Sequence, residues 1–179
     1  KLGAIINLID VRSDYKQIKK YLMEVESSTV VVMDNFLPEF DKCMKDEDVN
    51  LLVERIITLS PFNSVLFPFN KLIEKKKKKE EPELYTKIEE IKNKDKYISW
   101  NEMMTTTKYL YPHYPKYKKN TVAAYVHTGG TTGVPKTVKL SNENFNAMAI
   151  QYEHLGANYN KADTFLNGIV PFVAYGIVV

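Results

Sequence analysis

Arginine is scarce in this chain, and its scarcity argues against a nucleic-acid partner. Of the 25 basic residues only Arg12 and Arg55 are arginines, and the net charge at pH 7 is only +3. Proteins that read bases and phosphates favour the bidentate guanidinium fork. A charge this small also creates no general demand for a polyanion. The composition therefore predicts no nucleic-acid partner.

Cysteine is nearly absent, which excludes two further classes of protein. Cys43 is the single cysteine, so the chain cannot form an internal disulfide and has no C-x-x-C metal site. The three histidines, at positions 113, 127 and 154, lack the spacing of metal ligands. No apolar run reaches the length of a bilayer-spanning helix. We expect no bound structural metal and a cytoplasmic location, because free thiols are typical of reducing compartments.

The composition is that of a folded globular domain, with 44% hydrophobic and 26% charged residues among 179. Both ends are apolar, KLGAIINLID at the start and FVAYGIVV at the close. Since termini are usually polar and frayed, we expect a fragment of a larger domain. The expected organisation is one α/β fragment over residues 1–179, interrupted by a charged low-complexity excursion at about 70–96.

The first third of the chain follows a strand, helix, strand pattern. Ala4–Ile9 is a short apolar run, and Thr29–Met33 (TVVVM) predicts a fully buried strand. Between them, Ser13 is placed to cap a helix whose apolar positions, Tyr15 to Val25, recur every three or four residues. This order is typical of a βαβ unit. The predicted fold class is α/β, a mostly parallel sheet with flanking helices.

The middle of the chain is less regular. A short helix is predicted at 38–45 and a strand at 55–59, although the apolar residues from Val49 to Ile56 also fit a helical period. Ser99 and Glu102 have the spacing of a capping box, which predicts a helix starting there. A proline-tyrosine loop then covers residues 109–120.

The last third contains three predicted strands and one helix. The strands cover residues 121–126, 137–140 and 165–170. Ser141 is a predicted N-cap for a helix that ends near Gly156 and carries Phe145, Met148 and Tyr152 on one face.

Glycine is also scarce, with seven in the whole chain, yet three stand within five positions of HTGGTTGVPKT at 127–137. Glycines let backbone N–H groups converge on an anion, because positive φ costs them little. The threonine hydroxyls can donate to phosphate oxygens, and Lys136 supplies a positive charge. The spacing is neither that of a Walker loop nor G-x-G-x-x-G. A plain hairpin connection is the alternative, but this combination favours a phosphate-binding loop.

This stretch resembles the phosphate-loop signature of the adenylate-forming superfamily, which includes acyl-CoA synthetases, luciferase and nonribosomal peptide adenylation domains. Ser141 and Asn144 fit the tail of the signature, and Gly129 resembles the long-chain fatty acyl branch. The matching loop residues, which the resemblance predicts to bind the nucleotide, are Thr128, Gly129, Gly130, Thr131, Thr132, Gly133 and Lys136, with Pro135 between the last two.

A second, looser resemblance lies in PFVAYG at 171–176, similar to a segment that borders the family's carboxylate pocket. It predicts Val173, Tyr175 and Gly176 as substrate-pocket residues. The sequence departs from the family pattern at His127, usually an aromatic, and at Thr137, usually a glycine. Asn142 stands in place of a histidine, and Val173 stands near the position of a common pocket histidine.

The resemblance implies an ATP-dependent carboxylate–CoA ligase, with the α/β fold of this chain as an incomplete portion of its larger N-terminal adenylation domain. Such enzymes condense a carboxylate with ATP·Mg²⁺ to an acyl-adenylate and pyrophosphate, then pass the acyl group to coenzyme A. It implies ATP, Mg²⁺ and coenzyme A as cofactors and a fatty acid as the carboxylate. Thr131 and Thr132 would donate to the β- and γ-phosphates, and Lys136 would offset the leaving charge. No catalytic residue is assigned within this chain, and we expect the isolated fragment to be inactive.

Two other functions stay open from the sequence alone. A nucleotide-binding hydrolase or kinase needs a Mg²⁺-binding aspartate after a strand, and Asp10 and Asp34 both follow apolar runs. A non-catalytic truncated relative is the other alternative. Separately, VLFPFNKLIEKKKKK at 65–79 sets apolar residues beside a polybasic run that could contact an anionic membrane. Because Glu80, Glu81 and Glu83 follow directly, the sequence favours a solvated insertion instead.

Overall fold

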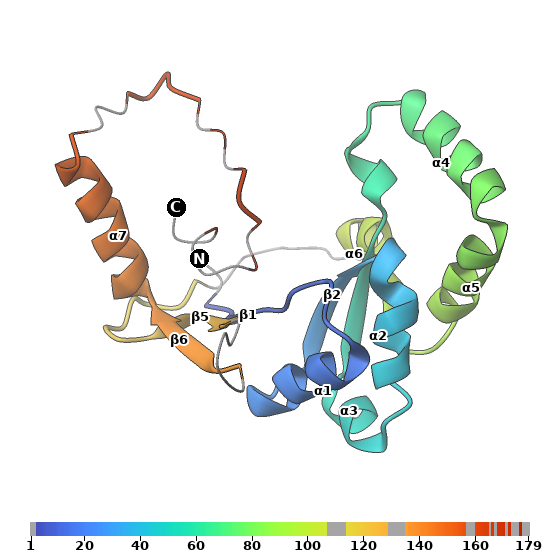
Figure 1. The fold of residues 1–179 in the computed structure, drawn as a ribbon, viewed down its shortest axis with the longest axis horizontal. Coiled ribbons are helices and arrows are strands. Elements are labelled where there is room, and N and C mark those ends of the chain that lie inside the picture. Colours follow the sequence, from blue (N-terminus) through green and yellow to red (C-terminus); the bar gives the residue numbers. More distant parts are fainter. Residues whose placement is uncertain are drawn as a thin grey trace. The chain divides into compact units, whose positions relative to one another are not determined.

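The structure is a computed structural model. It describes residues 3–106, 114–128, 135–156 and 160–164, together with 166, 168–170, 172 and 176. The chain divides into two compact units (Figure 1). We call Ser13–Leu110 the helical unit, and Lys1–Arg12 with Tyr111–Val179 the motif unit, because the glycine-rich loop belongs to the latter.

The helical unit is built on a parallel sheet. Its three strands are β2 (Thr29–Met33), β3 (Arg55–Leu59) and β4 (Tyr97–Ser99), in the order β2-β3-β4. Both pairings are parallel, with Val31 opposite Ile57 and Ile57 opposite Ile98.

The helices of this unit precede, follow or connect the strands (Figure 1). They are α1 (Tyr15–Glu24), η1 (Asp34–Phe36), α2 (Leu37–Cys43), α3 (Glu47–Leu52), η2 (Pro61–Ser64), α4 (Phe69–Glu80), α5 (Pro82–Lys92) and α6 (Trp100–Thr106).

Burial along the strands corrects one prediction. The central strand β3 is buried at three consecutive residues, Ile56, Ile57 and Thr58. By contrast β2, predicted to be fully buried, alternates between exposed and half-buried residues, and Val31 is 53% exposed. The physical reason is that alternate side chains of a strand point to opposite faces of the sheet, and the face that carries Thr29, Val31 and Met33 is exposed.

Two helix starts show how local chemistry sets the element boundaries. The N-cap of α1 is Asp14, one residue after the predicted Ser13, and its carboxylate accepts from the Gln17 N–H at 2.8 Å. The apolar residues from Val49 to Ile56, which fit both a helix and a strand, belong partly to each: α3 ends at Leu52 and β3 begins at Arg55. The predicted helix after Ser99 is confirmed, with the Ser99 hydroxyl accepting from the Glu102 N–H at 3.1 Å.

The core of the helical unit includes part of the charged segment. Residues 70–96, expected as a low-complexity excursion, lie largely in α4 and α5. Ile88 and Ile91 of α5 are buried with Leu37 of α2, against partly buried side chains including Tyr97. No residue of α4 is buried, whereas α5 contributes to the hydrophobic core.

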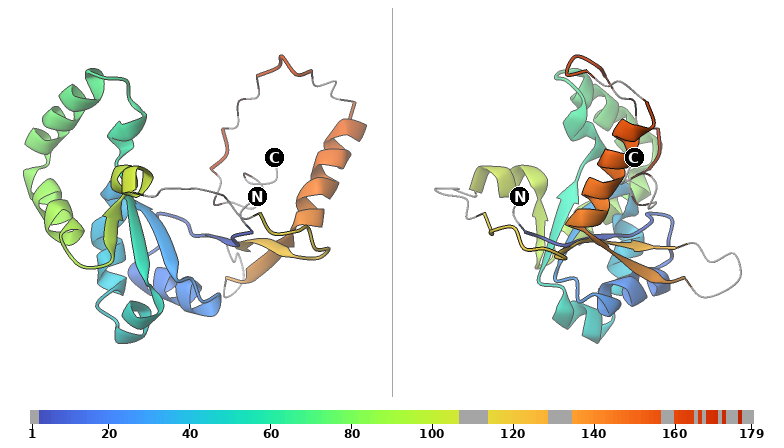
Figure 2. Two further views of the ribbon diagram at one scale, coloured as in Figure 1. Left: turned by 180° about the vertical axis from the view of Figure 1, so that it is seen from behind. Right: turned by 90° about the vertical axis from the view of Figure 1, so that its left-hand side faces the viewer.

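The motif unit contains a mixed sheet. Its strands are β1 (Ile6–Leu8), β5 (Val122–His127) and β6 (Thr137–Ser141), in the order β1-β5-β6. β1 pairs parallel with β5, and β5 pairs antiparallel with β6. Helix α7 (Asn142–His154) continues directly from β6 (Figure 2).

The α/β fold class is confirmed, but the sheet connectivity is not the predicted one. β1 and β2 belong to different sheets, so the predicted βαβ unit across residues 4–33 is wrong. Alternation of elements cannot show which strands will pair. The predicted strand at 165–170 is also wrong for its described residues, 166 and 168–170, which form no strand. Leu166 is exposed there, so its apolar character does not lead to burial.

Candidate phosphate-binding site

The two ends of the glycine-rich loop are held together at the end of the β5–β6 pair. The Thr128 N–H donates to the Lys136 carbonyl oxygen at 2.9 Å. The Thr128 hydroxyl donates to the same oxygen at 3.3 Å and accepts from the Lys136 N–H at 3.1 Å. These bonds place Thr128 and Lys136, the two described ends of the loop, next to each other. The Lys136 side chain is exposed and makes no ion pair with any described residue.

A line of polar side chains crosses the three strands below this closure. His127 on β5 faces Thr137 on β6 in the register, and its Nδ1 lies 3.0 Å from the Thr137 Oγ1. Its Nε2 lies 2.8 Å from the Oδ1 of Asn7 on β1. The imidazole thus connects both neighbouring strands, and each contact fixes the orientation of the ring.

The junction after β6 is fixed by a capping box. The Ser141 hydroxyl accepts from the Asn144 N–H at 3.3 Å, and the Asn144 Oδ1 accepts from the Ser141 N–H at 2.8 Å. These are the two residues that fit the tail of the family signature. The predicted N-cap is confirmed, and Gly156 follows the helix at a φ of +78°, where glycine is favoured.

Glu143, in the first turn of α7, fastens the segment that precedes β5. Its Oε1 accepts from the Tyr117 hydroxyl and, at 3.1 Å, from the Asn120 N–H. The Tyr117 hydrogen bond is the main reason that the pKa of Glu143 falls to about 2, and the same bond raises the pKa of Tyr117. The carboxylate is therefore ionised at neutral pH and restrains the chain just before the strand that leads to the loop.

Gly176 is the predicted pocket residue that lies among the described residues. A Cβ at this position would lie 2.2 Å from the Val170 carbonyl oxygen and 2.9 Å from the Ile169 Cγ2. Only glycine fits against this backbone. Near Gly176 in the sequence, the Arg12 guanidinium carbon lies 5.8 Å from the centre of the Phe172 ring. This cation–π contact links the first and last segments of the motif unit.

Several predicted site residues lie outside the described residues. They are Gly129, Gly130, Thr131, Thr132, Gly133, Val173 and Tyr175. The structure thus locates the two loop ends, Thr128 and Lys136, and it brings these together. It places Gly176 against residues 169–170.

Asp10 and Asp34, the aspartates that a kinase or hydrolase would use to bind Mg²⁺, both form ion pairs with basic side chains. The Arg12 guanidinium contacts both carboxylate oxygens of Asp10, at 2.6 to 3.2 Å, and lowers the pKa of that carboxyl. Asp34 is buried, and its Oδ2 accepts from the Lys92 Nζ at 2.7 Å. Within the described residues, no group of three or more potential ligand side chains is placed to hold a metal ion.

Comparison with known proteins identifies the family. The family model for AMP-binding enzymes matches residues 1–179, the whole of the chain. The chain belongs to the AMP-binding enzyme family. No curated protein matches it. The match supports the adenylate-forming resemblance of the loop and an assignment to the ligases that use ATP.

The sequence interpretation missed the role of His127. It noted His127 and Thr137 as separate departures from the family pattern, yet the structure places them opposite each other and in hydrogen-bonding contact. A signal was available, because His127 directly follows one predicted strand and Thr137 begins the next, so the two residues flank the loop. Two polar residues at facing positions of a hairpin are expected to interact.

Proposed function

We propose that this AMP-binding chain comes from a ligase that activates a carboxylic acid, a fatty acid in our assignment, and transfers it to coenzyme A. The hydrogen bonds between Thr128 and Lys136 carry the proposal, because they hold the two described ends of the motif together, and the Lys136 side chain is exposed there. Gly129, which resembles the long-chain fatty acyl branch, supports the choice of substrate. The cytoplasmic location belongs to the same proposal.

In this proposal, the loop binds the β- and γ-phosphates of ATP·Mg²⁺. The glycine N–H groups and the hydroxyls of Thr131 and Thr132 donate hydrogen bonds, and Lys136 stabilises the charge that develops on the departing pyrophosphate. Thr128 has a different part, because its hydroxyl is already bonded to the backbone of Lys136. It holds the loop ends together, so that the donors are positioned before ATP binds.

The test compares ATP with AMP as ligands of the 179-residue chain. Lys136→Ala should weaken ATP binding about 10- to 100-fold, the usual value of a charge-assisted hydrogen bond, and leave AMP binding unchanged. Lys139→Ala is the matched control, an exposed lysine three residues along β6. Isothermal titration calorimetry measures both affinities. Equal losses for ATP and AMP would place Lys136 away from the β- and γ-phosphates and contradict the assignment.

The choice of acid and thiol is tested by activity. We propose that the isolated chain binds ATP without forming an acyl-adenylate, since the loop supplies phosphate contacts and no residue of this chain is assigned a catalytic role. ATP–pyrophosphate exchange over a panel of carboxylic acids checks this directly. Exchange by the purified chain would refute the inactivity, and the acid that supports it would identify the substrate class.

A further inference from the structure

Helix α4 carries an exposed apolar face that nothing in the proposed ligase function uses. Phe69, Leu72 and Ile73 lie three and four residues apart, so they share one side of the helix. Phe69 is 62% exposed and Leu72 is 61% exposed. The two residues that lead into this region, Leu66 and Phe67, are exposed as well.

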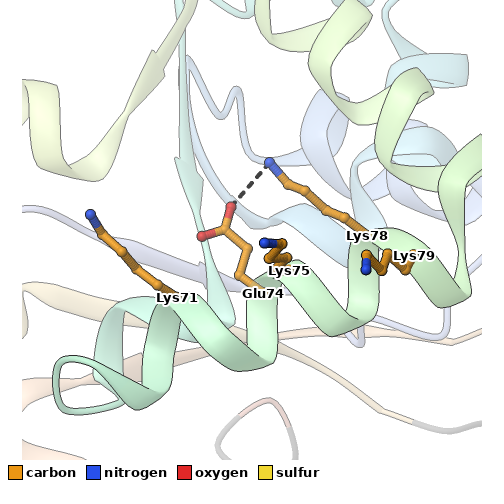
Figure 3. A pocket seen from close by; sticks show the side chains of 5 residues that line it. All are labelled: Lys71, Glu74, Lys75, Lys78 and Lys79. Atoms are coloured by element: carbon orange, nitrogen blue, oxygen red, sulfur yellow. Dashed lines mark ion pairs between the residues drawn. The ribbon is translucent and has the colours of Figure 1, made fainter.

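A stripe of lysines runs beside this apolar face. Lys71, Lys75 and Lys79 are spaced four residues apart, and with Glu74 and Lys78 they line a shallow depression along the helix (Figure 3). Lys71, Lys75 and Lys79 make no ion pair with any described residue. The Lys71 ammonium lies 5.9 Å from the centre of the Phe67 ring, so cationic and apolar groups meet directly.

Three of the glutamates around the polybasic run, Glu74, Glu80 and Glu81, form ion pairs with other lysines. Glu74 pairs with Lys78 at 3.1 Å, as Figure 3 shows, and Glu80 pairs with Lys77 at 3.0 Å. Lys78 also contacts Glu89 of α5, at 3.2 Å. The sequence favoured a solvated insertion because the acids seemed to cancel the lysines. In the folded chain they neutralise one part of the helix and leave the stripe charged.

We propose that α4, with the preceding residues 66–68, is a docking surface for an anionic lipid bilayer. Exposed apolar side chains can enter the boundary between headgroups and acyl chains, while neighbouring lysines reach the headgroup phosphates and carboxylates. A bilayer satisfies both halves of this surface. A nucleic acid or an acidic protein loop would neutralise the lysines but leave Leu72 and Ile73 in water. Among the described residues no helix is long and apolar enough to cross a membrane, and surface docking needs none.

The experiment is co-sedimentation of the chain with lipid vesicles. We expect binding to vesicles of phosphatidylcholine mixed with phosphatidylserine and little binding to phosphatidylcholine alone. Raising the salt concentration should release the protein, because exposed charges are then screened. The triple variant Lys71→Gln, Lys75→Gln, Lys79→Gln should bind the anionic vesicles about 100-fold more weakly.

Matched variants separate docking from general charge or folding effects. Lys20, Lys45 and Lys87 are exposed lysines elsewhere in the helical unit, and changing all three to glutamine should leave binding within about threefold, because they lie outside α4. Leu72→Ser should weaken binding about 10-fold, whereas Leu51→Ser, at an exposed site on α3, should not. Circular dichroism confirms that each variant is folded.

A second measurement reports insertion itself. Trp100 is the single tryptophan, so Phe69→Trp combined with Trp100→Phe puts the only indole on the apolar face of α4. Its fluorescence should shift to the blue on anionic vesicles. The proposal is overturned if the chain binds neither kind of vesicle, if the lysine triple variant binds as well as the original chain, or if the indole at 69 stays in water. Binding to RNA without binding to vesicles would equally overturn it.

Discussion

The two units of this chain are stabilised by different kinds of interaction. Of the thirteen buried hydrophobic side chains among the described residues, eleven belong to the helical unit and only Ala124 and Val126 to the motif unit. The motif unit has instead a dense set of polar contacts around the loop ends, from Asn7 to Glu143. Among the described residues, apolar packing is thus concentrated in the helical unit, which also has partly buried polar contacts such as Lys94 with Asp41, whereas the motif unit depends mainly on directional bonds.

This difference matters because the two kinds of interaction restrain a protein in different ways. Apolar packing is non-directional and stabilises in proportion to the buried area, whereas hydrogen bonds fix particular atoms at particular distances. In the proposed function a loop that presents several donors to one phosphate group needs fixed ends, and the bonds of Thr128, His127 and Ser141 restrain the chain on either side of it. The comparison predicts that truncating apolar side chains will chiefly destabilise the helical unit, and removing polar ones will chiefly affect the motif unit.

The largest expected effect is in the packed core of the helical unit. Leu37 is fully buried with Ile88 and Ile91, so Leu37→Ala should lower the free energy of unfolding by about 2–5 kcal/mol. Cys43, the single cysteine, is a built-in probe, because burial raises the pKa of its thiol to about 11 and keeps it protonated. Its rate of reaction with a thiol reagent in increasing urea measures the opening of this unit.

Leu51→Ala is the control for this prediction. Leu51 lies on α3 and is 77% exposed, so its truncation should change the free energy of unfolding by no more than about 0.5 kcal/mol. If Leu37→Ala and Leu51→Ala lowered the free energy of unfolding by similar amounts, the core around Leu37 would not dominate the stability of the helical unit.

The next largest effect concerns the polar line below the loop. His127→Ala removes the contacts to Thr137 and Asn7 and should destabilise the motif unit by about 1–3 kcal/mol. It should also weaken ATP binding more than AMP binding, because a loosened hairpin end lets the loop ends separate. His154→Ala is the control, since the His154 ring has its contact within its own helix, at 2.8 Å to the Ile150 carbonyl oxygen, and none to another strand or helix of the described residues.

A double-mutant cycle makes this prediction sharper. If His127 and Thr137 act as a pair, the loss in free energy of unfolding for the variant changed at both positions should be smaller than the sum of the two single losses. The difference should be about 0.5–1.5 kcal/mol. Thr137→Gly, which restores the usual family residue, should be tolerated better in a His127→Phe background than in the original chain. Simple additivity would show that the two departures from the family pattern are independent.

The sequence predicted local structure better than it predicted pairing. The strand at 29–33, the helix after Ser141 and the hairpin strands around the loop follow from periodicity and capping, which act over a few residues. Strand partners depend on contacts across more than a hundred residues, as between Asn7 and Tyr125, and no local pattern encodes them. For the same reason the predicted βαβ unit was wrong.

The charged segment illustrates a second limit. Five consecutive lysines indicated a solvated excursion, but Ile88 and Ile91 in the following helix were enough to anchor α5 in the core. For the site, the residue types of the loop led to the prediction of phosphate binding, and the family match supports the resemblance behind it. The bracing by His127, Thr137 and Glu143 was not predicted, because side-chain bonds between strands become visible only once the register is known.

The smallest expected effect is a pH dependence at the start of α7. The folded state lowers the pKa of Glu143 to about 2, mainly through the Tyr117 hydroxyl, from an ordinary value of 4.5. A lowered carboxyl pKa adds stability that is fully present above the ordinary pKa and is lost as the pH falls through this window towards 2. Glu143→Gln should therefore flatten the acid side of the stability curve of the motif unit, and Tyr117→Phe should narrow the window by raising the pKa of Glu143. Thermal unfolding at a series of pH values measures both changes.

Glu153→Gln, an exposed change on the same helix, serves as the control. If the stability of Glu143→Gln falls with decreasing pH as steeply as that of the original chain, the contacts of Glu143 with Tyr117 and Asn120 contribute little to the stability of the motif unit.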